Sequence, residues 1–259
     1  MFTWSPDPEM FSMGPIHIRW YGLLFSLAFL ASFAVMVWIF RKEKKGDDLL
    51  NKLFLYVFIG VVAGARLGHC LFYSPEFYLS HPLEILKIWE GGLASHGAAA
   101  GILLAIMMFV RRTPGTTFFW VTDRVSVVIP LAAIFVRLGN FVNSEILGLP
   151  ASVPWAVVFA RVDDIPRHPV QLYEALTYLV IFLVMIFLYK RGTGARAGRL
   201  TGSMVAMLFS MRFVLEFFKT GQSTLDPSLP ITMGQLLSVP LVAFGVWLLL
   251  RKPAASTHS

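Results

Sequence analysis

The chain has 259 residues, of which 56% are hydrophobic and only 14% are charged, with a mean hydropathy of +0.68. Soluble domains carry about a quarter charged residues, so this composition excludes an ordinary soluble enzyme and favours a chain solvated mainly by lipid. The formal net charge is +7, and Cys70 is the single cysteine, which excludes an intrachain disulfide.

Long apolar segments follow one another along the chain. A helix needs about 20 mostly apolar residues to cross a bilayer. We predict seven such spans, at 20–40, 53–73, 92–110, 125–143, 172–189, 201–218 and 233–250. Residues 4–18 are expected to form an interfacial arm, and residues 144–171 a small outer head loop. The prediction is therefore an all-α polytopic membrane protein, with residues 1–259 forming a single membrane-embedded domain.

The basic residues predict the orientation of these spans. Most of the 22 Lys and Arg residues flank one set of helix ends, with clusters at 41–45, 111–112 and 190–199. Loops on the cytoplasmic side of membrane proteins carry this excess. We therefore predict that the N-terminus lies outside and that the C-terminus is cytoplasmic.

Several polar residues fall inside the predicted spans, where charged side chains are costly unless they are paired or hydrated. In the predicted topology they gather near the outer helix ends: Tyr21, Arg66, His69, His96, Arg137, Asn140, Asn143, Gln171, Tyr173, Glu174, Arg212, Glu216 and Gln235. Ion pairs that only join helices are expected at different depths in the membrane, whereas these residues share one depth. We therefore interpret this set as a functional site. For Arg212 and Glu216, four residues apart, an ion pair that only joins helices remains an alternative.

The arginines and one histidine suggest the chemistry. Arg137 and Asn140 are three residues apart, so they share a helix face. A guanidinium presents a planar fork of donors that matches a phosphate, which makes an outer-leaflet lipid phosphate the simplest ligand. His96 lies in a segment rich in Gly and Ala, 91–101, where a substrate can approach closely. It is a candidate base or substrate contact, with a purely structural histidine as the alternative.

The residues Arg137 to Gly148 (RLGNFVNSEILG) closely resemble the signature of the prolipoprotein diacylglyceryl transferase family. The resemblance covers nearly the whole chain and includes the segments 20–22, 91–101, 167–174, 212–218 and 233–235. The chain departs from the family pattern at Val136, where Gly is usual, at Leu208, where Tyr is frequent, and at Lys219, where Arg is usual. The stretch between Gly148 and Arg167 is also short.

This resemblance implies a multi-pass transferase of the bacterial inner (cytoplasmic) membrane, with its active site toward the outer leaflet and periplasm. It implies transfer of the diacylglyceryl group from phosphatidylglycerol to the thiol of the lipobox cysteine of prolipoproteins, with release of glycerol-1-phosphate. That reaction is the first step of bacterial lipoprotein maturation. The expected partners are phosphatidylglycerol, prolipoprotein signal peptides and the bilayer, with no nucleic acid. No metal or other cofactor is expected.

The same resemblance suggests roles for the candidate residues. The expected catalytic residues are His96, as the base that forms the thiolate, and Arg137 and Arg212, which hold the charge developing on the leaving phosphate. His96 as a mere positioning group, with a phosphate oxygen taking the proton, is the alternative. Glu216 is expected to orient Arg212, and Glu145 to orient Arg137. The expected phosphatidylglycerol-binding residues are Tyr21, Arg137, Asn140, Asn143, Glu145, Gly148 and Glu216.

Three other classes of membrane protein remain as alternatives. A transporter for an anionic solute also uses arginines within the membrane, but the sequence shows neither internal repeats nor polar groups at the midplane. A lipid-binding subunit without chemistry would tolerate Arg137→Lys, whereas a site needing a bidentate donor would not. A metal-dependent head-group enzyme needs paired carboxylates, but Asp123 and the Asp163–Asp164 pair fall on opposite sides in the predicted topology.

Overall fold

The computed structural model describes residues 2–14, 16–88, 91–220 and 231–251, and it is 71% helical. Six of the described helices are long and apolar enough to cross a membrane. They are α1 (Trp20–Lys42), α2 (Asp47–Tyr73), α5 (Phe118–Val142), α6 (Val170–Lys190), α7 (Arg199–Leu215) extended by η4 (Glu216–Phe218), and α8 (Met233–Leu250). The seventh apolar helix, α4 (Ser95–Arg111), has 17 residues. The prediction of an all-α polytopic membrane protein is confirmed.

The chain divides into two compact units. The first contains the residues up to 35 and those from 123 onward, and the second contains residues 36–122. Helix α1 runs from the first unit into the second, and α5 returns from the second to the first. The single membrane-embedded domain stays a prediction.

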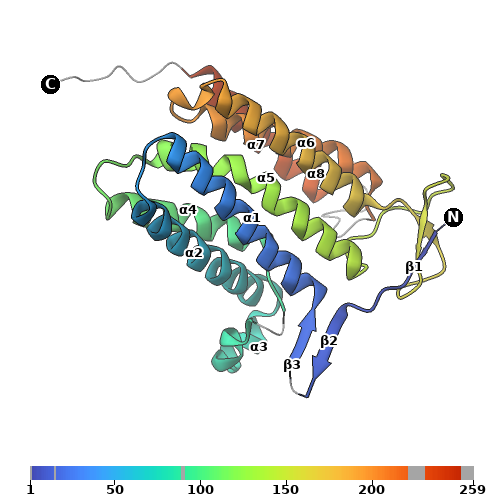
Figure 1. Cartoon of the computed structure of the whole chain (residues 1–259). Helices are drawn as coiled ribbons and strands as arrows, with labels where there is room; N and C mark the ends of the chain where they lie inside the picture. The colour runs from blue at the N-terminus through green and yellow to red at the C-terminus, as the bar shows by residue number, and fades with distance from the viewer. Residues whose placement is uncertain (1, 15, 89–90, 221–230, 252–259) are drawn as a thin grey trace. The chain divides into compact units, whose positions relative to one another are not determined.

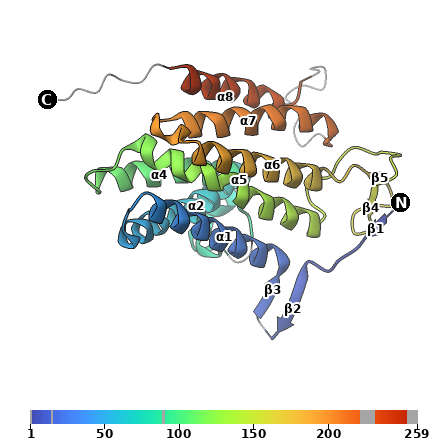
Figure 2. The same cartoon turned by 45° about the horizontal axis from the view of Figure 1, so that its top comes forward.

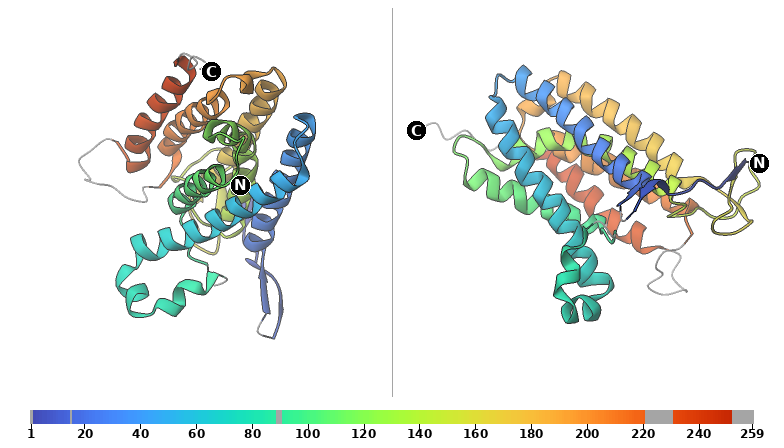
Figure 3. Two further views of the ribbon diagram at one scale, coloured as in Figure 1. Left: turned by 90° about the vertical axis from the view of Figure 1, so that its left-hand side faces the viewer. Right: turned by 60° about the horizontal axis from the view of Figure 1, so that its bottom comes forward.

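In the second unit, α2 and α4 lie side by side because glycines line both helices (Figure 1). A Cβ added to Gly68 would lie 2.7 Å from the Cα of Gly97, and one added to Gly64 would lie 2.9 Å from the Cα of Gly101. Small residues allow helix backbones to approach closely where no hydrophobic effect drives association. The short helices α3 (Pro75–Ser80) and η1 (Pro82–Leu86) connect α2 to α4, and they project from the end of α2 (Figure 3).

In the first unit, α6, α7 and α8 follow one another as neighbouring helices (Figure 2). Helices α7 and α8 also meet at glycines, since a Cβ added to Gly245 would lie 2.6 Å from the backbone nitrogen of Ala206. The turn η3 (Thr193–Ala195) joins α6 to α7. The close α7–α8 contact brings the last turn of α7 next to the first turn of α8, where several polar residues of the candidate site lie.

Several helices have bounds that differ from those of the approximate predicted spans, and for α2 and α4 there is a local reason. Helix α2 begins at Asp47 rather than residue 53, because Asp47 and Asp48 suit the positive end of the helix dipole. Helix α4 begins at Ser95 rather than residue 92, since Gly91 and Gly92 have φ values of 94° and 68°. Helix α5 begins at Phe118 rather than residue 125, and the α-helical part of α7 ends at Leu215 rather than 218.

The early start of α5 places a charged residue, Asp123, in a buried position. Its side chain is fully buried and caps another helix, α7. The Asp123 carboxylate accepts hydrogen bonds from the backbone N–H of Gly198 at 2.7 Å and of Thr201 at 2.8 Å. It also accepts one from the Thr201 hydroxyl at 2.8 Å. Asp123 therefore supplies, from a distant part of the sequence, the cap that Gly198 lacks.

We expect Asp123→Ala to destabilise the protein by about 3 kcal/mol, because hydrogen bonds to a charged group are lost and their donors stay buried. The melting temperature in detergent should fall by roughly 6–12 °C for a chain of this size. Asp164→Ala, a matched change at an exposed aspartate, should leave it unchanged. A fall below about 2 °C in Asp123→Ala would contradict the capping role.

The predicted head loop contains β-structure that hydropathy did not predict. Strand β1 (Phe2–Trp4) pairs in parallel with β4 (Val157–Phe159), which pairs antiparallel with β5 (Pro166–Arg167). Strands β2 (Glu9–Met13) and β3 (Ile16–Arg19) form an antiparallel hairpin within the segment expected to be an interfacial arm. The Arg167 guanidinium lowers the pKa of Asp163, and a hydrogen bond from His17 lowers the pKa of Glu9.

Candidate functional site

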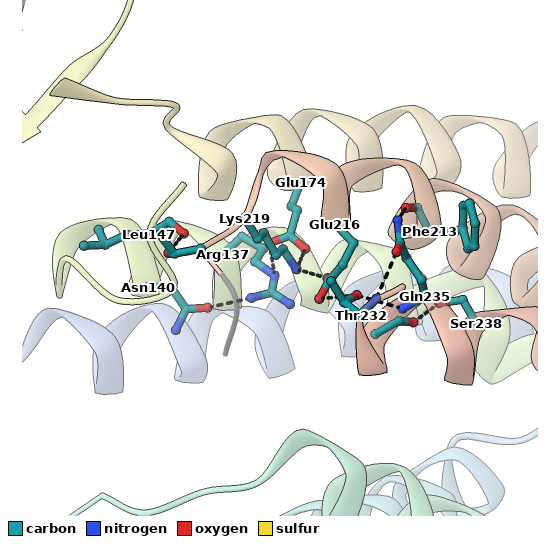
Figure 4. A network of polar contacts seen from close by, with 12 residues as sticks. Arg137, Asn140, Leu147, Glu174, Phe213, Glu216, Lys219, Thr232, Gln235 and Ser238 are labelled. Carbon is teal, nitrogen blue, oxygen red and sulfur yellow. Dashed lines mark hydrogen bonds and ion pairs between the residues drawn. The ribbon is translucent and has the colours of Figure 1, made fainter. Parts of the chain in front are cut away.

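Glu174 is the centre of a buried ion-pair network in the first unit. Its side chain is 1% exposed, and it lies at the beginning of α6. One carboxylate oxygen, Oε2, is 3.0 Å from Nε of Arg137, and the other, Oε1, is 2.8 Å from Nζ of Lys219 (Figure 4). The exposed side-chain fractions of Arg137 and Lys219 are 14% and 8%. The carboxylate therefore neutralises cations from two other segments, the end of α5 and the end of η4.

A second carboxylate, Glu216, extends this network toward α8. Its Oε2 is 3.4 Å from Nζ of Lys219, and its Oε1 accepts a hydrogen bond from the Thr232 hydroxyl at 3.2 Å (Figure 4). Thr232 also caps α8 in a capping box with Gln235. A Cβ on Gly234 would lie 2.5 to 2.8 Å from the Glu216 carboxylate, so a larger residue here would displace that carboxylate from its present position. The Met233–Gln235 motif is thereby explained by its fit against Glu216.

On the other side, Arg137 connects to the end of its own helix. Its Nη1 donates to Oδ1 of Asn140 at 3.2 Å, and Nδ2 of Asn140 donates to Glu145 at 2.9 Å. Nδ2 of Asn143 donates to the other oxygen of Glu145 at 3.0 Å. Glu145 faces back toward α5 because the chain turns sharply there, with positive φ at Ser144. The polar residues of the sequence motif thus form one connected chain of contacts.

Tyr21 and Gly139 fit against each other beside this chain. A Cβ on Gly139 would lie 2.8 Å from the Tyr21 ring, so the glycine allows the ring to lie directly on α5. Tyr21 interacts electrostatically with Glu145 and Arg137. The structure therefore brings Tyr21, from the start of α1, to the same end of the unit as the Arg137 motif.

Gly148 has a backbone role at the junction with the head. It forms an antiparallel bridge with Lys219, and its carbonyl accepts a hydrogen bond from Nη1 of Arg167 at 3.3 Å. A Cβ on Gly148 would lie 2.7 Å from Cγ2 of Val170 and would clash with the His168 carbonyl. The glycine thus lets three separate segments meet, and it positions the backbone from which Lys219 reaches Glu174.

Several buried side-chain oxygens near these residues have no hydrogen-bond partner among the described residues. Oδ1 of Asn143 and Oε1 of Gln171 are inaccessible and accept no hydrogen bond from the residues that the structure describes. A cavity of about 390 Å³ lies beside Asn143 and Glu145, and Arg19 and Arg161 also line it. Buried polar atoms without partners are uncommon in folded proteins. These acceptors are suited to a hydroxyl-bearing ligand or water.

His96 belongs to the second unit, in the first turn of α4. Its side chain is exposed, and its ring lies against two rings at the end of α2. The ring centroids are 5.3 Å from Phe72 and 5.9 Å from Tyr73. An exposed imidazole at a helix end that is rich in Gly and Ala is accessible to a substrate.

The expected orienting pairs were wrong. Within the described residues, Glu216 contacts Lys219 and Thr232, with no ion pair to Arg212. Arg137 pairs with Glu174 rather than with Glu145, which it reaches only through Asn140. Helical spacing places side chains on one face but does not decide between a partner on the same helix and one on a neighbouring helix.

Arg212 and three residues to which the sequence assigned no role complete this end of the unit. Arg212, at the end of α7, interacts electrostatically with Tyr178, a hydrogen-bonding partner of Arg137. Sequence reasoning included Glu174 in the polar set at the outer helix ends, since its carboxylate lies inside a predicted span, but gave it no role. It assigned no site role to Lys219 or Tyr178.

Comparison with known proteins relates the whole chain to one family. The family model described as prolipoprotein diacylglyceryl transferase matches residues 8–251. A phosphatidylglycerol–prolipoprotein diacylglyceryl transferase from Chloroherpeton thalassium is 50% identical over 247 residues, covering 95% of this chain and 92% of the relative. A protein of the same name from Tolumonas auensis is 48% identical over 250 residues, covering 96% and 97%.

Proposed function

The chain belongs to the prolipoprotein diacylglyceryl transferase family, and from this premise we propose that it transfers the diacylglyceryl group of phosphatidylglycerol to the lipobox cysteine thiol of prolipoproteins. It is a multi-pass membrane transferase of lipoprotein biosynthesis. We place it in the bacterial inner membrane, with the N-terminus outside, because basic residues flank the opposite helix ends. In this orientation the Arg137 network faces the outer leaflet.

The observation that carries the proposal is the connected network of Arg137, Glu174, Lys219 and Glu216 at one end of the first unit. Glu174 and Glu216 offset the charges of Arg137 and Lys219. Among the described residues, Arg212 has no carboxylate partner, so one guanidinium at this end is available to an anion. A lipid phosphodiester carries one negative charge and matches a guanidinium fork.

In the proposed reaction, the thiolate of the lipobox cysteine attacks the glycerol carbon that bears the phosphate ester. A carbon–sulfur bond forms, the carbon–oxygen bond breaks, and its electron pair leaves with the phosphate as glycerol-1-phosphate. His96 takes the thiol proton, since the thiolate and not the thiol is the nucleophile. Arg137 and Arg212 stabilise the charge that grows on the phosphate as the bond breaks.

The remaining site residues hold the lipid head group. Oδ1 of Asn143 accepts no hydrogen bond from the described residues, and it is suited to a hydroxyl of the head-group glycerol. Nδ2 of Asn143 donates to Glu145 at 3.0 Å, which fixes the orientation of the Asn143 amide. Tyr21 lies beside Arg137 and covers the same end of the bundle. Gly148 contributes through the backbone that positions Lys219.

The test uses purified protein in detergent with phosphatidylglycerol and a synthetic lipobox peptide. We expect a diacylglyceryl mass increase on the peptide and an equal amount of released glycerol phosphate. A peptide with serine in place of the cysteine should gain no mass, and phosphatidylethanolamine should not replace phosphatidylglycerol. Bound lipid without any mass increase on several peptides would instead indicate a lipid-binding protein without this chemistry.

His96→Gln tests the base. We expect turnover to fall about a hundredfold, because a positioned general base contributes at least this factor and glutamine cannot accept the proton. The rate should be measured from pH 6 to 9, since a high pH supplies thiolate without a base and should partly restore the variant. Retention of half or more of the wild-type rate at neutral pH would exclude His96 as the base.

A further inference from the structure

Arg66 is a buried cation on α2 that the proposed reaction does not use. Its side chain is 3% exposed, and it donates hydrogen bonds to backbone carbonyls of the segment between α2 and α4. Nη2 donates to Glu84 at 2.6 Å, Nε donates to Ile85 at 3.0 Å, and Nη1 donates to Gly91 at 2.6 Å. One guanidinium therefore binds the segment after α2 at two places, at Glu84 and Ile85 and again at Gly91.

Among the described residues, the acceptors of Arg66 are backbone carbonyls rather than a carboxylate. Within residues 16–88 and 91–220, no ion pair includes Arg66, and its guanidinium carbon lies 5.2 Å from the centre of the Tyr78 ring. A buried charge is strongly unfavourable without hydrogen-bonding partners, so the guanidinium and these carbonyls depend on each other. Lysine would bring one ammonium on a flexible stem and could not reach the same set of carbonyls with a planar fork.

Gly92 completes the same arrangement. It has a φ of 68°, and a Cβ there would lie 2.6 Å from the His69 ring and 2.9 Å from Nη1 of Arg66. Glycine is needed both for the backbone conformation and for the space. The connection is therefore fitted tightly around the Arg66 side chain at its last residues before α4.

The held segment leads directly to His96. The backbone N–H of Ala94 donates to the carbonyl of Ala65 at 2.9 Å, so the chain is attached to α2 beside Arg66. Helix α4 begins one residue later, with His96 in its first turn. The His96 ring rests against Phe72 and Tyr73 of α2. The start of α4 thus depends on contacts that Arg66 maintains.

We propose that Arg66 is a positioning residue for the transfer reaction: it holds Glu84, Ile85 and Gly91 on α2 and thereby sets the place of His96. The proposal rests on the role given to His96 above. Arg66 itself touches no substrate in this scheme.

The experiment compares Arg66→Lys with wild type in the full-length protein, and uses Arg111→Lys, at the exposed far end of α4, as the matched control. We expect kcat/KM of Arg66→Lys to fall about 10- to 100-fold, since small displacements of a catalytic group have effects of this size. KM for phosphatidylglycerol should change little. In a His96→Gln background the same substitution should lower kcat/KM by less than about twofold. Arg66 acts through His96 in this proposal, so its loss should matter little once the His96 imidazole is gone.

Hydrogen–deuterium exchange supplies a readout that needs no activity. Residues 82–96 should exchange faster in Arg66→Lys, while α7 and α8 stay protected. If Arg66→Lys does not fold, Gly92→Ala crowds the same contacts without removing the charge and should give the same pattern.

Unchanged exchange in residues 82–96 would overturn the proposal, and so would an equal loss of kcat/KM with and without His96. Full activity of His96→Gln would also overturn it. If the wild type transfers nothing while exchange rises in Arg66→Lys, the proposed function fails and the holding role of Arg66 stands.

Discussion

Replacing Arg137 by glutamine should lower diacylglyceryl transfer by about a thousandfold or more, the upper range for loss of one charge-stabilising donor in an active site. Two effects combine in this variant. The developing phosphate charge loses a guanidinium fork, and Glu174 loses the cation 3.0 Å from its Oε2. The measurement is kcat/KM with phosphatidylglycerol and a lipobox peptide, followed by peptide mass.

Two further variants make this result specific. Arg137→Lys keeps the charge but loses the planar fork, so its activity should stay near that of Arg137→Gln rather than near wild type. Arg191→Gln removes an exposed arginine over the Phe187 ring and should leave transfer unchanged. Arg137→Gln with more than a tenth of wild-type activity would show that the phosphate is held elsewhere.

Glu174→Gln should be the most destabilising single substitution in the network. The carboxylate is 1% exposed and contacts both Arg137 and Lys219. Its neutral replacement leaves these two largely buried cations with one carboxylate, Glu216, which contacts Lys219 alone. Removing one partner of a buried ion pair costs about 3–5 kcal/mol. The melting temperature should fall by roughly 10 °C, at about 2–4 °C for each kcal/mol. Because Cys70 is fully buried, a thiol-reactive dye reports the unfolding.

A second substitution distinguishes this cause from a general loss of packing. Lys219→Met placed on Glu174→Gln removes one of the two cations that lost the Glu174 charge, so the double variant should be more stable than Glu174→Gln alone. Glu76→Gln, at an exposed position in α3, is the matched control and should melt as wild type does. A double variant that is less stable than either single variant would contradict the electrostatic explanation.

Hydropathy and residue order predicted the helical architecture well, because insertion into lipid depends mainly on the local run of apolar residues. The bounds of α8 agree with prediction, and those of α1 and α6 agree to within two residues. The larger differences occur where a residue is stabilised by a distant segment. The sequence predicts a loop at Asp123. The residue is instead buried in a helix, because Gly198 and Thr201 donate hydrogen bonds to its carboxylate.

In the candidate site, too, residues close in sequence were predicted to lie together, and contacts between distant segments were not predicted. Arg137, Asn140, Asn143 and Glu145 are close in sequence, and the structure joins them in one chain of hydrogen bonds. Lys219 was noted only as a departure from the family pattern. Its contact with Glu174 arises because the end of η4 packs beside the start of α6, a proximity that the spacing along either helix does not contain.

By itself, the sequence determined the number and approximate bounds of the apolar helices, the transferase family and most of the polar residues at the helix ends. Those features depend on local composition and on short motifs. Only the tertiary structure decided which carboxylate neutralises which arginine, that β1 pairs with β4, and that Arg66 holds the segment before His96. The physical reason is that a charge removed from water must find a partner in space, and helix packing brings together residues that the chain itself keeps far apart.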